Sequence, residues 1–256
     1  MESNVTPSTT IVMEPEKVTV SIIDEQGMKT VKNTNIENIQ QIFMKEQAME
    51  TPLLPSQWGV VKYYRKNNYE GYIMTTPPTE REVNFSLREN GIPNKTIIPV
   101  PPMLWIFEVR EDREGRKSLQ HSMCYAMKHE LLSMKDQLLH APYPNIGIGH
   151  GICWGMELPP ATTGKSLQNI PARFFSSPFN YDLSSGRVKS FRYFREAEDR
   201  EIETDTAIYH MVKLAKDLAN SRESGEAFVY PFDTLKEGNN LTVEQAAKMY
   251  MPAIFN

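Results

Sequence analysis

The sequence predicts an α+β fold in which an antiparallel β-meander is flanked by helices. Alternating apolar residues separated by polar turns recur between residues 58 and 127, the pattern of consecutive antiparallel strands. Apolar residues at helical spacing occur before and after this region. Hydrophobic residues make up 40% and charged residues 23% of the 256 residues, which is ordinary for a globular chain.

The first 50 residues are expected to form a flexible N-terminus followed by a small hairpin and a helix. Residues 1–15 are rich in Ser, Thr and Pro, so we expect them to fray. Within residues 16–50, Lys17–Ile23 alternates with β-branched residues and turns at Glu25-Gln26-Gly27 into Met28–Val31. Asn35 is placed to cap a helix ending near Ala48.

Residues 51–200 are expected to form the core, beginning with strands over residues 58–65, 69–75 and 81–87. The next strand, Met103–Arg110, has apolar residues on both faces, as a central strand does. Its two faces are Met103, Trp105, Phe107 and Val109 on one side, and Leu104 and Ile106 on the other. The returning strand, Ser118–Met127, is predicted to present Leu119, Met123, Tyr125 and Met127 on one face. Loops dense in Pro and Gly follow, from Ala141 to Pro171.

Residues 201–256 are expected to form C-terminal helices. A stripe of apolar residues from Ile208 to Ala219 predicts a helix over residues 204–221. A final helix is predicted near Leu241, because Thr242 and Gln245 have the spacing of a capping box.

Charge and composition argue against several classes of function. The net charge is −4 and the basic residues are spread along the chain, so we expect no nucleic-acid partner. The longest apolar stretches, such as Met103–Phe107, are far too short to cross a bilayer, and the N-terminus does not resemble a signal peptide. Two isolated cysteines, Cys124 and Cys153, suit a reducing compartment, so we expect a cytoplasmic protein without a membrane partner.

The segment 141–158 carries the residues best suited to chemistry. Cys153 follows Gly147, Gly149 and Gly151, and glycines let the backbone approach a bound chain closely. Asn145 lies eight residues before Cys153, and its amide is able to donate a hydrogen bond to a developing oxyanion. The simpler alternatives are that Cys153 is a small buried hydrophobe and Asn145 a turn residue.

These residues resemble the motif of ubiquitin-conjugating enzymes, in which His-Pro-Asn precedes the catalytic cysteine by the same spacing. Here Tyr143-Pro144-Asn145 is followed by Gly151-Ile152-Cys153, and Pro101-Pro102 enters a strand as in those enzymes. The segments Ile152-Cys153-Trp154-Gly155 and Phe174–Phe179 resemble a prokaryotic ubiquitin-conjugating-like family that includes protein B of plasmid PRTRC systems. In this chain Tyr143 stands where the motif has its histidine, and that prokaryotic branch also lacks the histidine.

The resemblance implies a ubiquitin-conjugating-enzyme-like fold and a transferase that needs no cofactor. Cys153 would accept a ubiquitin-like modifier as a thioester from an activating-type adenylation enzyme and pass it to an amine. Asn145 would stabilise the oxyanion, and Tyr143, Gly151 and Trp154 would border the bound chain. The genetic setting implied is a bacterial plasmid, phage or other mobile element.

Two other functions remain open from the residues. The first is a non-catalytic interaction module of the same fold, suggested by Tyr143 in place of histidine and by the lack of an identifiable group that would tune the amine. The second is a cysteine hydrolase that pairs Cys153 with a distant histidine. His150 and Cys153 have the spacing of one ligand pair of a metal site. The sequence offers no second pair, so we expect no metal.

Overall fold

The computed structural model describes residues 8–14, 17–24, 26–34, 49–54, 59–86, 91–147, 149–155, 158–159, 164–183, 186–195 and 200–255. The chain divides into two compact units, residues 1–49 and 50–256. Each unit is described by itself.

The first unit contains a three-stranded antiparallel sheet with the order β1-β2-β3. Its strands are β1 (Ser8–Glu14), β2 (Lys17–Ile23) and β3 (Lys29–Thr34). The β2–β3 hairpin was predicted, whereas β1 lies in the segment expected to fray, where a run of Thr, Ile and Val favours a strand. The helix predicted before Ala48 lies outside the described residues.

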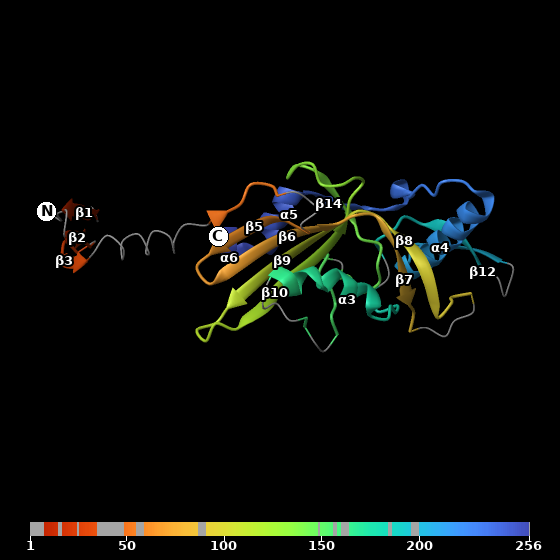
Figure 1. The fold of residues 1–256 in the computed structure, drawn as a ribbon, viewed down its shortest axis with the longest axis horizontal. Helices are drawn as coiled ribbons and strands as arrows, with labels where there is room; N and C mark the ends of the chain where they lie inside the picture. Colours follow the sequence, from red (N-terminus) through yellow and green to blue (C-terminus); the bar gives the residue numbers. More distant parts are fainter. Residues whose placement is uncertain are drawn as a thin grey trace. The chain divides into compact units, whose positions relative to one another are not determined.

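The second unit is built on a seven-stranded sheet with the order β14-β11-β10-β9-β6-β5-β4 (Figure 1). The strands are β4 (Met49–Glu50), β5 (Val60–Lys66), β6 (Tyr69–Thr76), β9 (Met103–Glu111), β10 (Lys117–Ala126), β11 (Gln137–His140) and β14 (Glu237–Thr242). Strands β5, β6, β9, β10 and β11 follow one another as antiparallel neighbours, which confirms the predicted meander. Strand β14 comes from the C-terminal region where only helices were expected, and it pairs with β11.

Strand β9 is buried on both faces, as its sequence predicted. Met103, Trp105, Phe107 and Val109 belong to one hydrophobic cluster. Leu104 and Ile106 belong to a second cluster on the opposite face of the sheet. The sheet is therefore the middle layer of this unit, with a core on each side.

Strand β10 departs from its predicted face because it contains a β-bulge. Leu119 pairs with Val109 but His121 pairs with Glu108, so Gln120 is an extra residue in the strand. A bulge shifts the alternation of side chains by one residue. Leu119 consequently packs on the face opposite Met123, and the prediction that they share a face is wrong.

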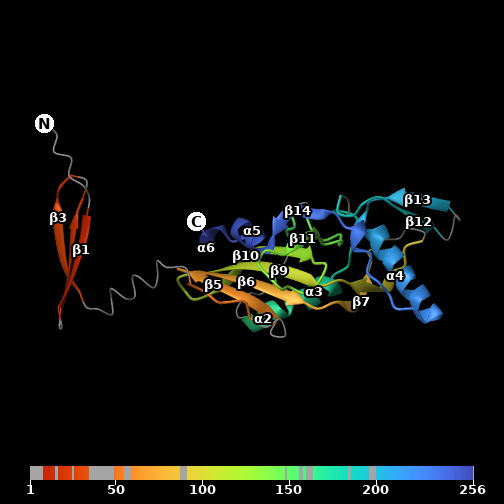
Figure 2. The ribbon, with the colours of Figure 1, turned by 90° about the horizontal axis from the view of Figure 1, so that it is seen from above.

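Helices cover both faces of the sheet (Figure 2). The helices that the structure describes in this unit are α2 (Gly164–Gln168), α3 (Ile170–Ser176), α4 (Ala207–Ser224), α5 (Val243–Tyr250) and α6 (Pro252–Phe255), with a 3-10 turn at Phe232–Thr234. Of these, α4 packs against β8 rather than against the seven-stranded sheet. Helix α3 packs in the cluster of Trp105, whereas α5 and α6 pack in the cluster of Leu104. Helix α2 lies inside the segment expected to be loop up to Pro171. The helix predicted over residues 204–221 is confirmed as α4. None of the helices that the structure describes is long and apolar enough to cross a membrane.

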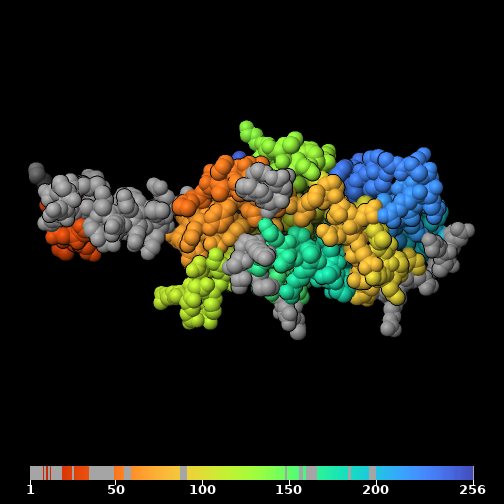
Figure 3. Space-filling model, viewed as in Figure 1, coloured from red at the N-terminus to blue at the C-terminus, as the bar shows by residue number. Residues whose placement is uncertain are grey.

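Two hairpins extend from one end of the sheet. They are β7 (Thr79–Asn84) with β8 (Lys95–Val100), and β12 (Phe191–Arg195) with β13 (Arg200–Thr204). Strand β7 overlaps the strand predicted over residues 81–87, whereas its partner β8 was not predicted. Helix α4 packs against β8, and the two form a continuous surface in Figure 3.

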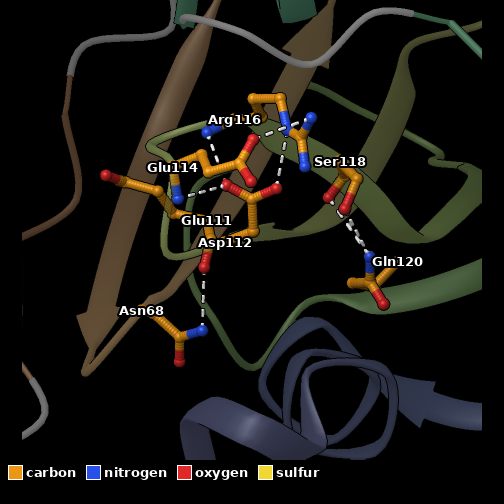
Figure 4. Close-up of polar contacts among 7 residues, drawn as sticks. All are labelled: Asn68, Glu111, Asp112, Glu114, Arg116, Ser118 and Gln120. Atoms are coloured by element: carbon orange, nitrogen blue, oxygen red, sulfur yellow. Dashed lines mark hydrogen bonds and ion pairs between the residues drawn. The ribbon is translucent and has the colours of Figure 1, made fainter.

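The turn between β9 and β10 is held by its own polar contacts (Figure 4). The Asp112 carboxylate accepts hydrogen bonds from the backbone N–H groups of Glu114 and Arg116, each at 2.9 Å. The Arg116 side chain, which donates to Asp112 at 2.8 Å, is the main reason why the pKa of Asp112 is lowered. Asn68, from the neighbouring β5–β6 turn, donates to the Glu111 carbonyl at 2.8 Å.

Candidate functional site

Asn145 and Cys153 lie directly opposite each other in a short hairpin. The Cys153 N–H donates to the Asn145 carbonyl at 2.8 Å, and the Gly147 N–H donates to the Gly151 carbonyl at 2.7 Å. Ile146 and Ile152 form an antiparallel bridge between these two pairs. The eight-residue spacing seen in the sequence is therefore the spacing that makes the two residues cross-strand partners.

Alternation along this hairpin exposes the thiol. Ile146 and Ile152 are 0% and 8% exposed and point into the core. Residues one position away point to the other side of an extended chain, so Asn145 and Cys153 share the outer face. Cys153 is exposed, whereas Cys124 is fully buried and burial raises its pKa well above the ordinary value. The interpretation of Cys153 as a buried hydrophobe is therefore wrong.

The cysteine-bearing arm of the hairpin is attached to β10 of the main sheet. The Ile152 N–H donates to the Ser122 carbonyl at 2.9 Å, and the Cys124 N–H donates to the His150 carbonyl at 3.1 Å. Met123 and Gly151 form an antiparallel bridge between these two bonds. This pairing adds the segment to the rigid scaffold of the sheet as a further short stretch of paired backbone.

The side chain of Asn145 is held by the chain after α3. Its Nδ2 donates to the carbonyl of Pro178 at 3.2 Å. The amide nitrogen carries two hydrogens, and the bond to Pro178 uses one of them. The Phe174–Phe179 segment, whose phenylalanines pack in the core, therefore also supplies a carbonyl that orients Asn145.

Tyr143 supports the hairpin from within the core. It is 1% exposed, its ring stacks on Phe179 at 6.2 Å between centroids, and it meets Phe174 and Phe175 edge-on. Burial raises the pKa of its hydroxyl, which has no hydrogen-bond partner among the described residues. The structure thus places Tyr143 beneath the surface that a bound chain would contact.

Trp154 and Gly151 flank the thiol. The indole Nε1 of Trp154 donates to the Ser122 hydroxyl at 2.9 Å, and its ring meets Phe174 edge-on at 6.3 Å. Ser122 therefore contacts both neighbours of Cys153, through its carbonyl to Ile152 and its hydroxyl to Trp154. Ser122 was not predicted, because it lies 31 residues before the cysteine.

The left-handed position in this loop is occupied by histidine. His150 has φ of +67°, whereas the described glycines with positive φ do not include Gly147, Gly149 or Gly151. This conformation costs a residue with a side chain about 1–2 kcal/mol. The close approach of a bound chain, which was expected of these three glycines, is a separate property and stays a prediction.

The His150 ring is fully buried in a stack with Tyr125 and His140. Burial, together with His140 and Arg187, lowers the pKa of His150 to about 3. Burial, Arg187 and Lys236 lower the pKa of His140 to about 4. Both imidazoles are therefore neutral at physiological pH.

No hydrogen bond joins the Cys153 thiol to any of the five histidines in the part of the chain that the structure describes. The same described residues contain no group of three or more His, Cys, Asp or Glu side chains able to hold a metal ion. What the site offers is an exposed thiol with an oriented amide beside it.

Comparison with known protein families gives a match to this chain. The model of a family described as Prok-E2_D, prokaryotic E2 family D, matches residues 35–206, which include both arms of the hairpin and α3. No curated protein and no solved structure matches the chain.

Proposed function

Because the chain belongs to prokaryotic E2 family D, we propose that it accepts a ubiquitin-like modifier as a thioester on Cys153 and transfers it to an amine. The observation that carries this proposal is the cross-strand pairing of Asn145 with an exposed Cys153. Nucleophilic attack requires an accessible thiol, and amine attack on a thioester requires a donor beside the carbonyl oxygen. The pair supplies both on one face of one hairpin.

The proposed reaction has two steps. The Cys153 thiolate attacks the carbonyl carbon of the modifier's C-terminus, held as a thioester on an activating-type adenylation enzyme. A new C–S bond forms, and the activating enzyme's cysteine leaves as a thiolate. An amine nitrogen then attacks the same carbon, the resulting oxyanion accepts the Asn145 N–H, and collapse expels the Cys153 thiolate. The amine's proton passes to solvent.

Loading by the cognate activating enzyme, its modifier and ATP tests this proposal. We expect an adduct that dithiothreitol removes, and we expect none from Cys153→Ala. Cys124→Ala is the matched control, because Cys124 is buried and its loss should leave loading intact. An adduct that survives in Cys153→Ala, or no adduct from the wild-type chain, would contradict the proposal.

A non-catalytic interaction module of the same fold is the second candidate. It is favoured by Tyr143, which occupies the position of the motif histidine but is buried and points no donor at the thiol. It predicts an exposed Cys153 that alkylating reagents modify but that the activating enzyme does not load.

The genetic setting, which we propose to be a plasmid, phage or other mobile element, is tested by the identity of the neighbouring genes. Adjacent genes for an adenylation enzyme and a small ubiquitin-like protein would favour the transferase.

A further inference from the structure

His150 occupies a position in its loop where a glycine would be less strained. Its φ of +67° lies in the left-handed region, and Gly149 and Gly151 stand on either side of it in other conformations. A methyl group built on Gly149 would meet no atom within 4 Å, so that neighbour does not require a glycine for space. Strain of this kind persists only where the surrounding structure holds the residue in place.

What holds His150 is a stack of rings from two strands. Its imidazole lies 4.3 Å from the Tyr125 ring of β10, with 26° between their planes. It lies 4.3 Å from the His140 ring of β11, with 27° between those planes. Asn239 of β14 approaches the imidazole Nε2 at 3.4 Å. One ring thus connects the loop to three consecutive strands of the sheet.

The backbone of the same residue determines the geometry of the hairpin. The His150 N–H donates to the Gly147 carbonyl at 2.8 Å and closes the tip of the hairpin. Its carbonyl accepts the Cys124 N–H at 3.1 Å and fastens the returning arm to β10. Three residues later, the Cys153 N–H reaches the Asn145 carbonyl. The stacked ring therefore holds His150 in place, and the backbone of His150 in turn determines which residue of the first arm pairs with Cys153.

We propose that His150 is a positioning residue, whose stacked ring fixes the register between Asn145 and Cys153. The inference rests on the proposed function, because the register matters for chemistry only if Asn145 serves the thioester on Cys153. Loss of the ring loosens the hairpin and displaces the Asn145 amide from the carbonyl that it should contact. The exposure of the thiol is unchanged, so loading is retained while transfer to the amine slows.

Two substitutions at this position separate the ring from the backbone. His150→Asn keeps a residue that tolerates the left-handed conformation but removes the ring. His150→Phe keeps a flat ring for the stack and removes the imidazole nitrogens. Gly149→Ala is the control, because it changes the same loop without contacting the stack.

The measurement is single-turnover transfer of the modifier from Cys153 to free lysine. We expect His150→Asn to slow transfer at least about tenfold, since displacement of a catalytic group by about 1 Å costs up to about 100-fold. We expect His150→Phe and Gly149→Ala to stay within about threefold of the wild-type rate. In the Asn145→Ala background, His150→Asn should have no further effect, because both changes remove the same interaction.

Additive effects of His150→Asn and Asn145→Ala, or wild-type transfer by His150→Asn, would overturn the assignment. Amide hydrogen exchange at Cys153 tests the positioning role without any modifier, since the Cys153 N–H is hydrogen-bonded to the Asn145 carbonyl. Faster exchange in His150→Asn but not in His150→Phe supports the positioning role even if the wild type forms no thioester, in which case the proposed function alone fails. An exchange rate at Cys153 that is unchanged in His150→Asn overturns the positioning role. If His150→Asn does not fold, His140→Ala removes the stack from the other side and is measured in the same way.

Discussion

At the scale of single residues, the proposed function depends on which way two side chains point. Ile146 and Ile152 turn inward, and their burial forces the cross-strand pair next to them outward. The thiol is thereby exposed without any opening of the core. The amide beside it is oriented by a backbone carbonyl, that of Pro178, rather than by another side chain. A carbonyl is a fixed acceptor, so in the proposed reaction the Asn145 side chain would be oriented before the substrate binds.

Replacement of Asn145 by alanine should slow transfer to the amine and leave loading intact. In the proposed reaction the lost donor acts on the oxyanion of the second step, and removal of one such donor typically costs about 100- to 1,000-fold in rate. Asn145→Asp is the stricter comparison, because it keeps the size of the side chain but loses the N–H donors. Single-turnover rates of both steps provide the check. Equal slowing of loading and transfer would contradict this role.

Ser122→Ala should destabilise the segment around Cys153. In the wild-type chain the Trp154 indole N–H donates to the Ser122 hydroxyl at 2.9 Å, and the change removes this acceptor. Loss of a hydrogen bond of this type lowers the free energy of unfolding by about 1 kcal/mol. Ser122→Thr keeps the hydroxyl and suits a strand, so urea unfolding should place it near the wild type. Equal stability of the Ala and Thr variants would show that the bond contributes nothing.

At the scale of elements, the sequence predicted best where a pattern was local and uninterrupted. The two faces of β9 and the cap of α5 follow from residues a few positions apart, and both are confirmed. The face of Leu119 was wrong because the bulge at Gln120 depends on the pairing of β10 with β9, not on either strand alone. Strand β14, with sequence Glu-Gly-Asn-Asn-Leu-Thr, has little intrinsic strand preference and forms by pairing with β11.

Thr242→Ala should weaken α5 and the face of the sheet that it covers. The Thr242 hydroxyl accepts the Gln245 N–H, and the Gln245 side chain accepts the Thr242 N–H, which completes a capping box. Loss of such a cap typically lowers the free energy of unfolding by about 1 kcal/mol. Thr242→Ser retains the cap and should unfold at nearly the wild-type urea concentration. Identical midpoints for Thr242→Ala and the wild type would contradict the assignment of the cap.

At the scale of the whole molecule, the sheet of the second unit separates two cores, and the site lies where β10 meets the hairpin on its flank. The spacing of Asn145 and Cys153 was visible in the sequence because it lies within one hairpin. Ser122, the Pro178 carbonyl and the His150 stack were not, because they come from segments brought together only by the fold. The sequence signals available were His150 between two glycines, for the stack, and Pro178 within the Phe174–Phe179 segment, for the carbonyl.

Stability of the whole chain should fall as the pH drops from about 7 to 5. Burial is the largest cause that lowers the pKa of His140 to about 4 and those of His150 and His210 to about 3, from an ordinary value of 6.5. The unfolded chain therefore binds protons in this window that the folded chain does not, and the free energy of unfolding must decrease with falling pH. Urea unfolding across this range provides the check.

His210→Leu is the matched variant for this pH dependence. His210 is buried in α4, away from the hairpin, and its removal should reduce the pH slope by about one proton. A wild-type stability that is flat or rises between pH 7 and 5 would contradict the burial of neutral histidines.

The direct test of the central claim is the mass and linkage of the loaded chain. After incubation with the cognate activating enzyme, modifier and ATP, mass spectrometry of the wild-type chain should show one modifier attached at Cys153 and released by dithiothreitol. In Cys153→Ser the same site should carry an oxyester that dithiothreitol does not release, since the nucleophile is changed and its position is not. Attachment at any other residue, or no attachment to either chain, would contradict a thioester on Cys153.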